Sequence, residues 1–334
     1  MPVRLRIFPS RRRLLVLLAL AALPVFAWLL WSPGADIRDG RHDLQTNAIW
    51  MQRGWLADDA WLARNGKSPE AFRDPSRIAT AAMLLQTHHI RFVYPHLCPC
   101  RSDGALALSD PTQVERFLDG FAGFDVFPWV GGARGETARI ADPAWRSGFA
   151  QACAAMVRQH PRLGGVHVNI ETIPSGDADF LAVLEAVRHA LPAGKRLSVA
   201  AYPPRTRWQP TMEVHWDETY AGAVAARVDQ VVVMMYDTGL HSSKLYEQLM
   251  KNWTREVLAW YAPDQVLLGV PAYDDAGVEY HDPATENLAH GLAGVHAGLA
   301  PMPGNYAGVA IYSEWQMTPE KWKIYEERFQ RAGP

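Results

Sequence analysis

The chain has 334 residues, of which 49% are hydrophobic and 20% are charged, and it contains 13 tryptophans. This is a globular composition, which excludes a disordered chain and a disulfide scaffold. Five of the 33 basic residues are arginines that precede the first acidic residue, Asp36, so the remainder has 28 basic against 35 acidic residues, a net charge of −7. This balance argues against nucleic acid or an anionic surface as the ligand of the main domain.

Near the N-terminus, residues 1–13 form a basic flank to residues 14–31 (LLVLLALAALPVFAWLLW), an uncharged run of 18 residues. Such a run is long enough to span a bilayer, and the arginines before it predict that its N-terminal side faces the cytoplasm. We therefore expect a single-pass anchor in the inner membrane, with the main domain on the periplasmic side. The sequence Val25-Phe26-Ala27 is compatible with signal cleavage, which would give a secreted domain, but the apolar residues beyond it favour a retained anchor.

Three cysteines, Cys98, Cys100 and Cys153, make an odd count. A bridge across the C-P-C spacing would close a very small and strained ring, so we expect these two thiols to be unbridged. Two sulfurs without nearby matching ligands are weak evidence for zinc. No metal and no other cofactor is predicted.

Residues 32–47 are predicted to form a linker, and eight short apolar runs alternate with helical patterns beyond it. The predicted strands cover residues 48–51, 90–94, 124–129, 165–171, 197–202, 230–236, 266–270 and 308–312, and helical periodicity is clear over residues 145–160, 178–190 and 245–261. Strands rich in Val, Ile and Leu that alternate with helices pair in parallel. Residues 48–334 therefore predict an α/β fold, a single (β/α)₈ TIM barrel. An open doubly wound sheet, the alternative, would bring a Gly-rich phosphate turn after its first strand, and residues 52–59 contain none.

The fourth predicted strand lies in the stretch GGVHVNIE, residues 164–171, whose apolar and polar residues alternate. Side chains alternate between the faces of a strand, so His167, Asn169 and Glu171 share one face. The apolar residues between them suit the helix-facing side of a barrel, which leaves the polar three in the interior. Glu171 then falls at the carboxyl end of its strand, where the catalytic groups of TIM barrels collect. A structural glutamate held by an arginine or a backbone amide is the alternative.

Residues 163–171 resemble a degenerate copy of the signature D-G-x-D-x-D-x-E of glycoside hydrolase family 18, which includes chitinases and endo-β-N-acetylglucosaminidases. Residues 233–237 (VMMYD) are similar to the family's M-x-Y-D, residues 269–273 (GVPAY) to its G-[IV]-P-x-Y, and residues 308–312 (GVAIY) to its G-V-x-x-W. These matches follow the family's order over most of residues 48–320. The chain departs from the signature where Gly164, His167 and Asn169 replace aspartates and Tyr312 replaces a tryptophan, which argues against an ordinary chitinase.

The resemblance implies a retaining, substrate-assisted mechanism, in which the 2-acetamido oxygen of the substrate attacks the anomeric carbon and one carboxyl group suffices. Glu171 would be the general acid and base, which requires a pKa raised toward the working pH. Asn169 would hold the acetamido group, and the N-x-E pair is also similar to the catalytic pair of glycoside hydrolase family 85. Tyr236 would donate its hydroxyl to the acetamido carbonyl with Asp237 beside it, although a barrel-lining tyrosine bonded to the backbone is the alternative.

Further contacts with the sugar are predicted at strand ends and in the loops that follow. A neutral His167 would orient Asn169, although a satisfied interior histidine is the alternative. The predicted substrate contacts, besides His167 and Asp237, are Trp129, Tyr202, Tyr312 and Trp315, and Trp50 and Trp208 are further candidates for flat platforms under a sugar ring. Each of these aromatic residues is equally compatible with core packing.

We therefore expect a glycosidase that acts on an N-acetylhexosamine-containing envelope or extracellular polysaccharide. The alternative is a catalytically inactive carbohydrate-binding barrel with a role in polysaccharide binding or assembly, since fold does not guarantee function. A metal-dependent hydrolase that uses His167, Glu171 and either His96 or Asp237 is a third hypothesis, but no metal motif such as H-E-x-x-H is present. The sequence leaves open which glycan is bound, whether action is endo or exo, and the oligomeric state.

Overall fold

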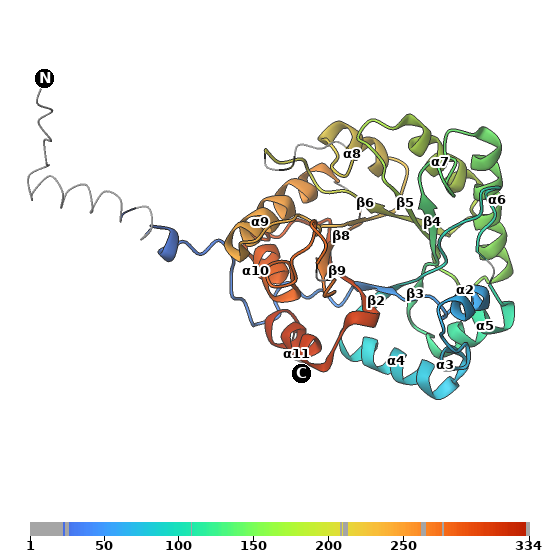
Figure 1. Cartoon of the computed structure of the whole chain (residues 1–334), viewed down its shortest axis with the longest axis horizontal. Helices are drawn as coiled ribbons and strands as arrows, with labels where there is room; N and C mark the ends of the chain where they lie inside the picture. Colours follow the sequence, from blue (N-terminus) through green and yellow to red (C-terminus); the bar gives the residue numbers. More distant parts are fainter. Residues whose placement is uncertain are drawn as a thin grey trace, which may run out of the picture.

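The computed structural model describes residues 23, 27–107, 109–207, 209, 213–261, 265–275 and 277–331. Within these residues a wholly parallel sheet curls into a ring, and helices surround it (Figure 1). The strands are β1 (Asn47–Met51), β2 (Ile90–Pro95), β3 (Asp125–Val126), β4 (Trp129–Ala133), β5 (Gly165–Glu171), β6 (Arg196–Ala201), β7 (Gln230–Val233), β8 (Gln265–Pro271) and β9 (Tyr306–Tyr312). Their hydrogen-bonded order is β3-β2-β1-β9-β8-β7-β6-β5-β4.

The strands β3 and β4 together occupy one place in the ring. β3 pairs with β2, β4 pairs with β5, and a parallel bridge joins His96, just after β2, to Trp129. The predicted single strand over residues 124–129 is therefore two strands, because Pro128 between them has no N–H to donate to the ladder. With β3 and β4 counted as one, eight positions alternate with helices around the ring, and the expectation of a TIM-barrel-like α/β fold is confirmed.

The helices of the outer layer are α2 (Asp59–Arg64), α3 (Glu70–Arg73), α4 (Pro75–Thr87), α5 (Pro111–Gly120), α6 (Pro143–Gln159), α7 (Ala178–Ala190), α8 (Glu218–Ala225), α9 (Ser243–Trp260), α10 (Leu288–Gly298) and α11 (Pro319–Arg328), with a 3₁₀ turn η1 (Glu314–Gln316). Of these, α6, α7 and α9 begin and end within two residues of the three helical ranges that the sequence predicts. Helix α7 coincides with the predicted range. Its start is fixed by Asp177, whose carboxylate accepts a hydrogen bond from the backbone N–H of Phe180.

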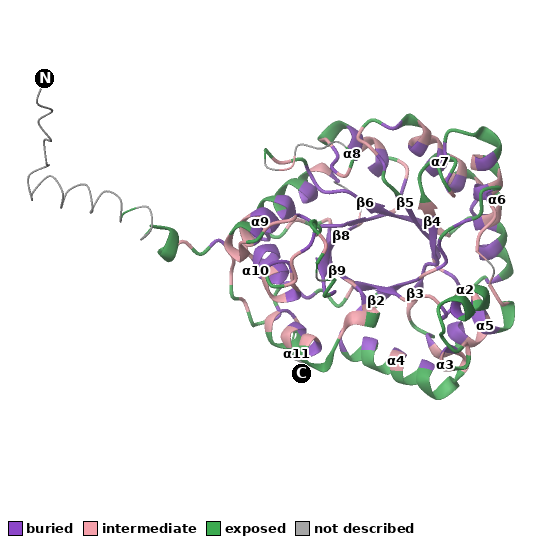
Figure 2. Cartoon of the chain, in the orientation of Figure 1, coloured by how far each residue is buried: buried purple, intermediate pink, exposed green. Residues whose placement is uncertain are grey.

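Burial follows the alternation that the sequence of β5 predicts. Val166, Val168 and Ile170 are buried in the apolar layer between the strands and the helices. His167 and Asn169 are buried on the opposite, inner face of the ring, where a second apolar cluster includes Trp50 and Trp129. Figure 2 shows the strands of the ring buried along their length and the exposed residues on the outside of the helices. The barrel is therefore filled with side chains, as in other TIM barrels.

The predicted membrane segment, residues 14–31, lies outside the described residues apart from residue 23 and residues 27–31. No helix among the residues that the structure describes combines the length and the hydropathy needed to cross a membrane. The predicted linker lies against the barrel, because the backbone N–H of Ala35 donates to the carbonyl of Ala293 in α10 at 2.9 Å and that of Gly34 donates to the carboxylate of Glu247 in α9 at 3.2 Å. All three cysteines are free and buried, which confirms the expected unbridged pair.

Candidate active site

The carboxyl ends of the barrel strands surround a cavity of about 450 Å³. This volume is typical of cavities that bind small molecules, and TIM-barrel enzymes carry their active sites at this end of the barrel. The cavity is lined by side chains from strand ends and from the loops that follow: Trp50, Trp129, Asn169, Glu171, Tyr202, Pro203, Val214, His215, Met234, Tyr236, Asp237, Tyr280 and Tyr312. Aromatic rings form most of the wall, and Glu171 and Asp237 contribute its two carboxyl groups.

Glu171 and Asn169 are the last two inward-facing residues of β5. The Asn169 amide donates through Nδ2 to Oε1 of Glu171 at 2.7 Å. Glu171 is open to the cavity, but protein atoms crowd its carboxyl group, and this burial raises its pKa, while the hydrogen bond from Asn169 acts in the opposite direction. The Oδ1 atom of Asn169 is buried and accepts no hydrogen bond within the described part of the chain. The pair thus presents a carboxyl group with a raised pKa and a free acceptor to the same cavity.

Tyr236 lies in the loop after β7, which is separated from β5 by β6 alone. Its ring stacks on that of Tyr312 from the end of β9, with the centroids 5.4 Å apart, and meets Tyr273 at an angle of 79°. Burial raises the pKa of Tyr236 well above its ordinary value, and neighbouring Tyr312, Asp237 and Glu171 act in the same direction. The phenol of Tyr236 is therefore neutral and able to donate a hydrogen bond. The predicted strand over residues 230–236 ends at Val233 in the structure, so Tyr236 belongs to a loop.

Asp237 follows with a left-handed backbone, φ 61°. Its Oδ1 atom accepts a hydrogen bond from the hydroxyl of Tyr273 and lies 3.7 Å from Nδ1 of His281. Burial raises the pKa of Asp237 to about 6, with a further contribution from the charge of Glu171. The two carboxyl groups of the cavity therefore interact, and ionisation of either one favours the protonated form of the other.

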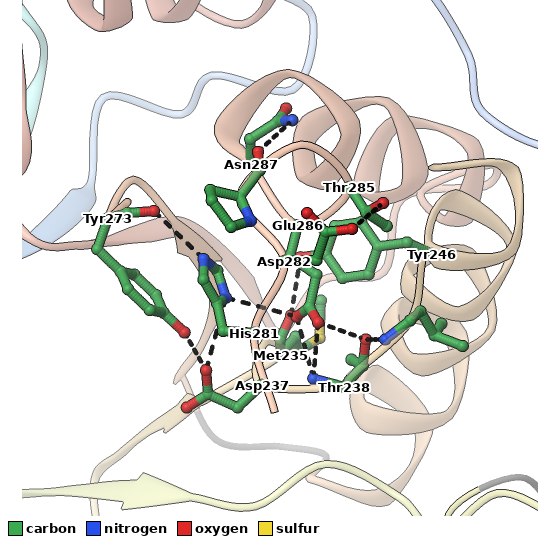
Figure 3. A network of polar contacts seen from close by, with 12 residues as sticks. Met235, Asp237, Thr238, Tyr246, Tyr273, His281, Asp282, Thr285, Glu286 and Asn287 are labelled. Carbon is green, nitrogen blue, oxygen red and sulfur yellow. Dashed lines mark hydrogen bonds and ion pairs between the residues drawn. The ribbon is translucent and has the colours of Figure 1, made fainter. Parts of the chain in front are cut away.

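Behind Asp237 lies a buried polar network, in which His281 stands between Asp237 and Glu286 (Figure 3). His281 stacks on Tyr273 at 4.0 Å and donates through Nε2 to its carbonyl at 3.3 Å. Glu286 is fully buried and accepts hydrogen bonds from both the N–H and the hydroxyl of Thr238. Burial raises the pKa of Glu286 to about 7 and lowers that of His281.

His167 lies deeper in the barrel and does not line the cavity. Its Nε2 accepts a hydrogen bond from the indole N–H of Trp50 at 3.1 Å, so the proton of the neutral ring is on Nδ1. Nδ1 donates to the hydroxyl of Ser198 at 2.8 Å, and this hydroxyl donates to the side-chain oxygen of Gln230. Burial lowers the pKa of His167 to about 3. The structure therefore brings His167 together with Trp50 and Ser198, and the alternative of a satisfied interior histidine describes this geometry.

The remaining predicted contacts are divided between two places. Trp129, Tyr202 and Tyr312 line the cavity, whereas Trp315 lies beside Tyr312 in a second cavity, and Trp208 lies outside the described residues. His281 and Glu286 come from the loop between β8 and α10, and nothing in the local sequence pattern predicts their place behind Asp237. Tyr273 is the last residue of the GVPAY motif (residues 269–273), and this motif could have identified it as a site residue.

The described residues contain no group of three or more His, Cys, Asp and Glu side chains that could hold a metal ion. Of the residues named in the metal hypothesis, Glu171 and Asp237 line the first cavity, His96 lines the second and His167 lines neither. These four side chains are therefore not gathered at one centre.

The fold is similar to those of several solved structures. The spore cortex-lytic enzyme SleL of Bacillus cereus is 14% identical, with a TM-score of 0.58 over 85% of this chain and 74% of that protein. A class V chitinase of Pseudomonas fluorescens Pf-5 is 15% identical, with a TM-score of 0.56 over 84% of this chain and 98% of that protein. The chitinase RmChi1 of Rhizomucor miehei is 14% identical, with a TM-score of 0.54 over 85% of this chain and 99% of that protein. At such identities the likeness concerns the fold alone, and no curated protein matches the chain.

The model of the family "Glycosyl hydrolases family 18" matches residues 74–323. The matched range runs from α4 into α11 and contains Asn169, Glu171, Tyr236 and Asp237. It covers most of the chain, and it confirms the resemblance seen in the four sequence motifs. The chain therefore belongs to glycosyl hydrolases family 18.

Proposed function

We propose that this protein is a retaining glycosidase that cleaves N-acetylhexosamine-containing polysaccharide with the help of the substrate's own acetamido group. Membership of the family and the barrel fold support a glycoside hydrolase-like function in general. The observation that carries the specific proposal is the arrangement of Glu171, Asn169 and Tyr236 around one cavity, where a carboxyl group with a raised pKa, a free acceptor and a neutral phenol meet.

In the first step the acetamido oxygen attacks the anomeric carbon, the bond from that carbon to the leaving oxygen breaks, and Glu171 transfers its proton to the leaving oxygen. The N–H of Asn169 occupies Oε1 of Glu171, so the proton is carried by Oε2. In the second step water attacks the anomeric carbon, the acetamido oxygen is released, and the Glu171 carboxylate takes up a proton from the water. The raised pKa of Glu171 favours the protonated form that the first step needs, and the carboxylate left by that step is the base of the second.

Asn169 and Tyr236 are suited to hold the attacking group. The unpaired Oδ1 of Asn169 would accept the N–H of the acetamido group, and the phenol of Tyr236 would donate to its carbonyl oxygen. An amide carries no negative charge to balance the cyclic cation that forms in the first step. The carboxylate of Asp237, which lines the same cavity, would supply it once the pH is above its pKa of about 6.

The place of action is a proposal that rests on the sequence of residues 14–31 alone. An anchored segment of this length would hold the barrel on the outer side of the inner membrane, next to envelope polysaccharide.

A carbohydrate-binding barrel without catalysis is the second candidate. It is favoured by the absence of any second carboxylate hydrogen-bonded to Glu171 within the described residues, since Asn169 stands where the family signature has an aspartate. Such a protein would bind a glycan in the same cavity and release no product.

The test is product release from N-acetylglucosamine oligomers and envelope polysaccharides by the full chain, its Glu171→Gln variant and a Glu327→Gln control. Glu327 is exposed on α11 and pairs only loosely with Lys323, at 3.8 Å. We expect Glu171→Gln to lower kcat by about 100-fold or more, the usual contribution of general acid catalysis, and the control to be unchanged. Binding without product, equal in all three proteins, would instead establish the carbohydrate-binding barrel.

A further inference from the structure

A second cavity, of about 360 Å³, adjoins the first. Its lining comes from the loops after β1, β2 and α2, from α2 itself and from η1: Gln52, Arg53, Trp61, Lys67, His96 and Trp315. The Trp315 ring lies 5.6 Å from Tyr312 and the His96 ring lies 4.1 Å from Trp129, centroid to centroid. Because Tyr312 and Trp129 line the first cavity, the two cavities lie on either side of these contacting aromatic side chains.

The guanidinium of Arg53 is held in the second cavity by uncharged groups. Its Nε donates to Nδ1 of His96 at 3.1 Å, and its central carbon lies 4.9 Å from the centroid of the Trp61 ring. His96 is neutral, because Nδ1 accepts this bond and another from the N–H of Cys98, and burial lowers its pKa to about 3. Within the described part of the chain neither Nη1 nor Nη2 of Arg53 has a hydrogen-bond partner, so both remain available to a ligand.

No ion pair among the described residues neutralises the positive charge of this cavity. The ammonium of Lys67 lies 5.1 Å from the same Trp61 ring, and no carboxylate of the described residues lies within 4.0 Å of Lys67 or Arg53. The charge of Asp58 reaches Arg53, but its carboxylate caps α2 by accepting from the backbone N–H of Trp61 at 3.3 Å. The second cavity therefore contains two cationic side chains, Arg53 and Lys67, although the main domain as a whole carries a net negative charge.

We propose that this second cavity is a subsite for a carboxylate-bearing sugar residue, next to the N-acetylhexosamine residue in the first cavity. The inference rests on the proposed function. The planar fork of Nη1 and Nη2 of Arg53 matches the two oxygens of a carboxylate, and Lys67 adds a second charge. The Trp315 side chain, which is 39% exposed, offers its ring as a platform for the sugar. The substrate is therefore an acidic heteropolysaccharide rather than a neutral homopolymer.

The test uses the full chain, kept in detergent, in a Glu171→Gln background so that ligands bind without turnover. Calorimetry compares three tetrasaccharides: alternating N-acetylglucosamine and N-acetylmuramic acid, the same compound with its carboxyl groups reduced to alcohols, and alternating N-acetylglucosamine and glucuronic acid. We expect one of the acidic compounds to bind about 10- to 100-fold more tightly than the reduced compound, as for a charged hydrogen-bonded pair. The acid that binds identifies the source of the carboxylate, an ether-linked lactyl group or a uronic acid.

Variants then connect the preference to the cavity. Arg53→Gln should abolish the preference for the acid, and Lys67→Gln, a change at an exposed side chain with little risk to folding, should reduce it. Arg158→Gln, at an exposed arginine of α6 with no ion pair to the described residues, should leave it unchanged. If neither acid binds more tightly than the reduced compound, or if the preference survives both variants, the subsite is refuted. Cleavage by the wild-type chain is measured separately, so that acid-selective binding without cleavage would refute the glycosidase and retain the subsite.

Discussion

Replacement of Glu286 by glutamine should remove a large part of the pH dependence of stability. The Glu286 side chain is fully buried, its carboxyl group accepts from Thr238, and Nδ1 of His281 lies 3.9 Å away. Burial raises the pKa of Glu286 from 4.5 to about 7 in the folded chain. Between these values the folded state retains a proton that the unfolded state releases, so the free energy of unfolding falls as pH rises through this interval.

The size of this loss follows from the pKa difference. Each unit corresponds to about 1.4 kcal/mol, so the change from 4.5 to about 7 costs the wild-type chain about 3 kcal/mol once the pH is above 7. The uncharged amide of Glu286→Gln carries no such cost. Its N–H₂ group can also donate to Nδ1 of His281, which is buried and accepts no hydrogen bond within the described residues. The variant should therefore gain stability relative to wild type as pH rises from 5 to 8.

The assay is urea denaturation of wild type, Glu286→Gln and Glu327→Gln at pH 5, 6, 7 and 8, with the free energy of unfolding extrapolated to water. Asp237, whose pKa is raised to about 6, and His281, whose pKa is lowered, face Glu286 and also titrate. They remain in all three proteins, so the difference between variant and wild type reports the ionisation of Glu286 together with its electrostatic coupling to Asp237. A difference that stays constant from pH 5 to pH 8 would refute the buried ionisation, whatever the absolute stability of the variant.

Two further predictions concern Asn169 in β5 and its partner Gly131 in the neighbouring strand β4. Asn169→Asp would put two carboxyl groups in hydrogen-bond contact, and both cannot ionise at the same pH. The pair should therefore retain one proton to higher pH. In a pH–rate profile the basic limb of kcat/KM should move up by about one pH unit or more. In Gly131→Ala the new Cβ, on a backbone with φ +135°, would lie 1.9 Å from the carbonyl oxygen of Asn169. The free energy of unfolding should therefore fall by about 1–3 kcal/mol. The fall should be smaller in the control Gly176→Ala, where φ is +87° and no atom lies within 4 Å of the new Cβ. Equal midpoints of urea denaturation for the two glycine variants would contradict the steric argument.

The sequence was sufficient to predict the architecture because the signal is local. A strand with one face toward the helices and one face toward the interior alternates in polarity, and β5 shows this alternation over its whole length. Helix α7 carries Phe180, Val183, Leu184 and Val187 at helical spacing, and its observed range matches the predicted one. The division of the third predicted strand at Pro128 was missed because an apolar run hides the loss of one backbone donor.

The candidate site was predicted only where it lies on a strand or in a recognisable motif. Asn169 and Glu171 could be placed from strand alternation, and Tyr236 from its motif, although it lies in a loop. His281 and Glu286 follow β8 in a long loop whose path depends on tertiary contacts. Arg53 lies in the loop between β1 and α2, and Lys67 lies in the loop between α2 and α3. Such loops have no sequence periodicity, so the position of their side chains at the barrel mouth could be learned only from the structure.

The degenerate signature of β5 can be understood from the way its polar residues are satisfied. At the deep end, His167 has both ring nitrogens engaged, by Trp50 and Ser198, so it neither carries charge nor offers an atom to a ligand. Asn169, two residues nearer the cavity, has its amide N–H engaged by Glu171 and its oxygen unpaired. Unpaired buried acceptors cost free energy, and this one belongs to a residue that lines the cavity, where the proposed substrate would supply the missing donor. The residues that stand in place of the signature aspartates therefore put no charge into the interior of the barrel, and they leave an acceptor and an acid at the cavity where the proposed substrate would bind.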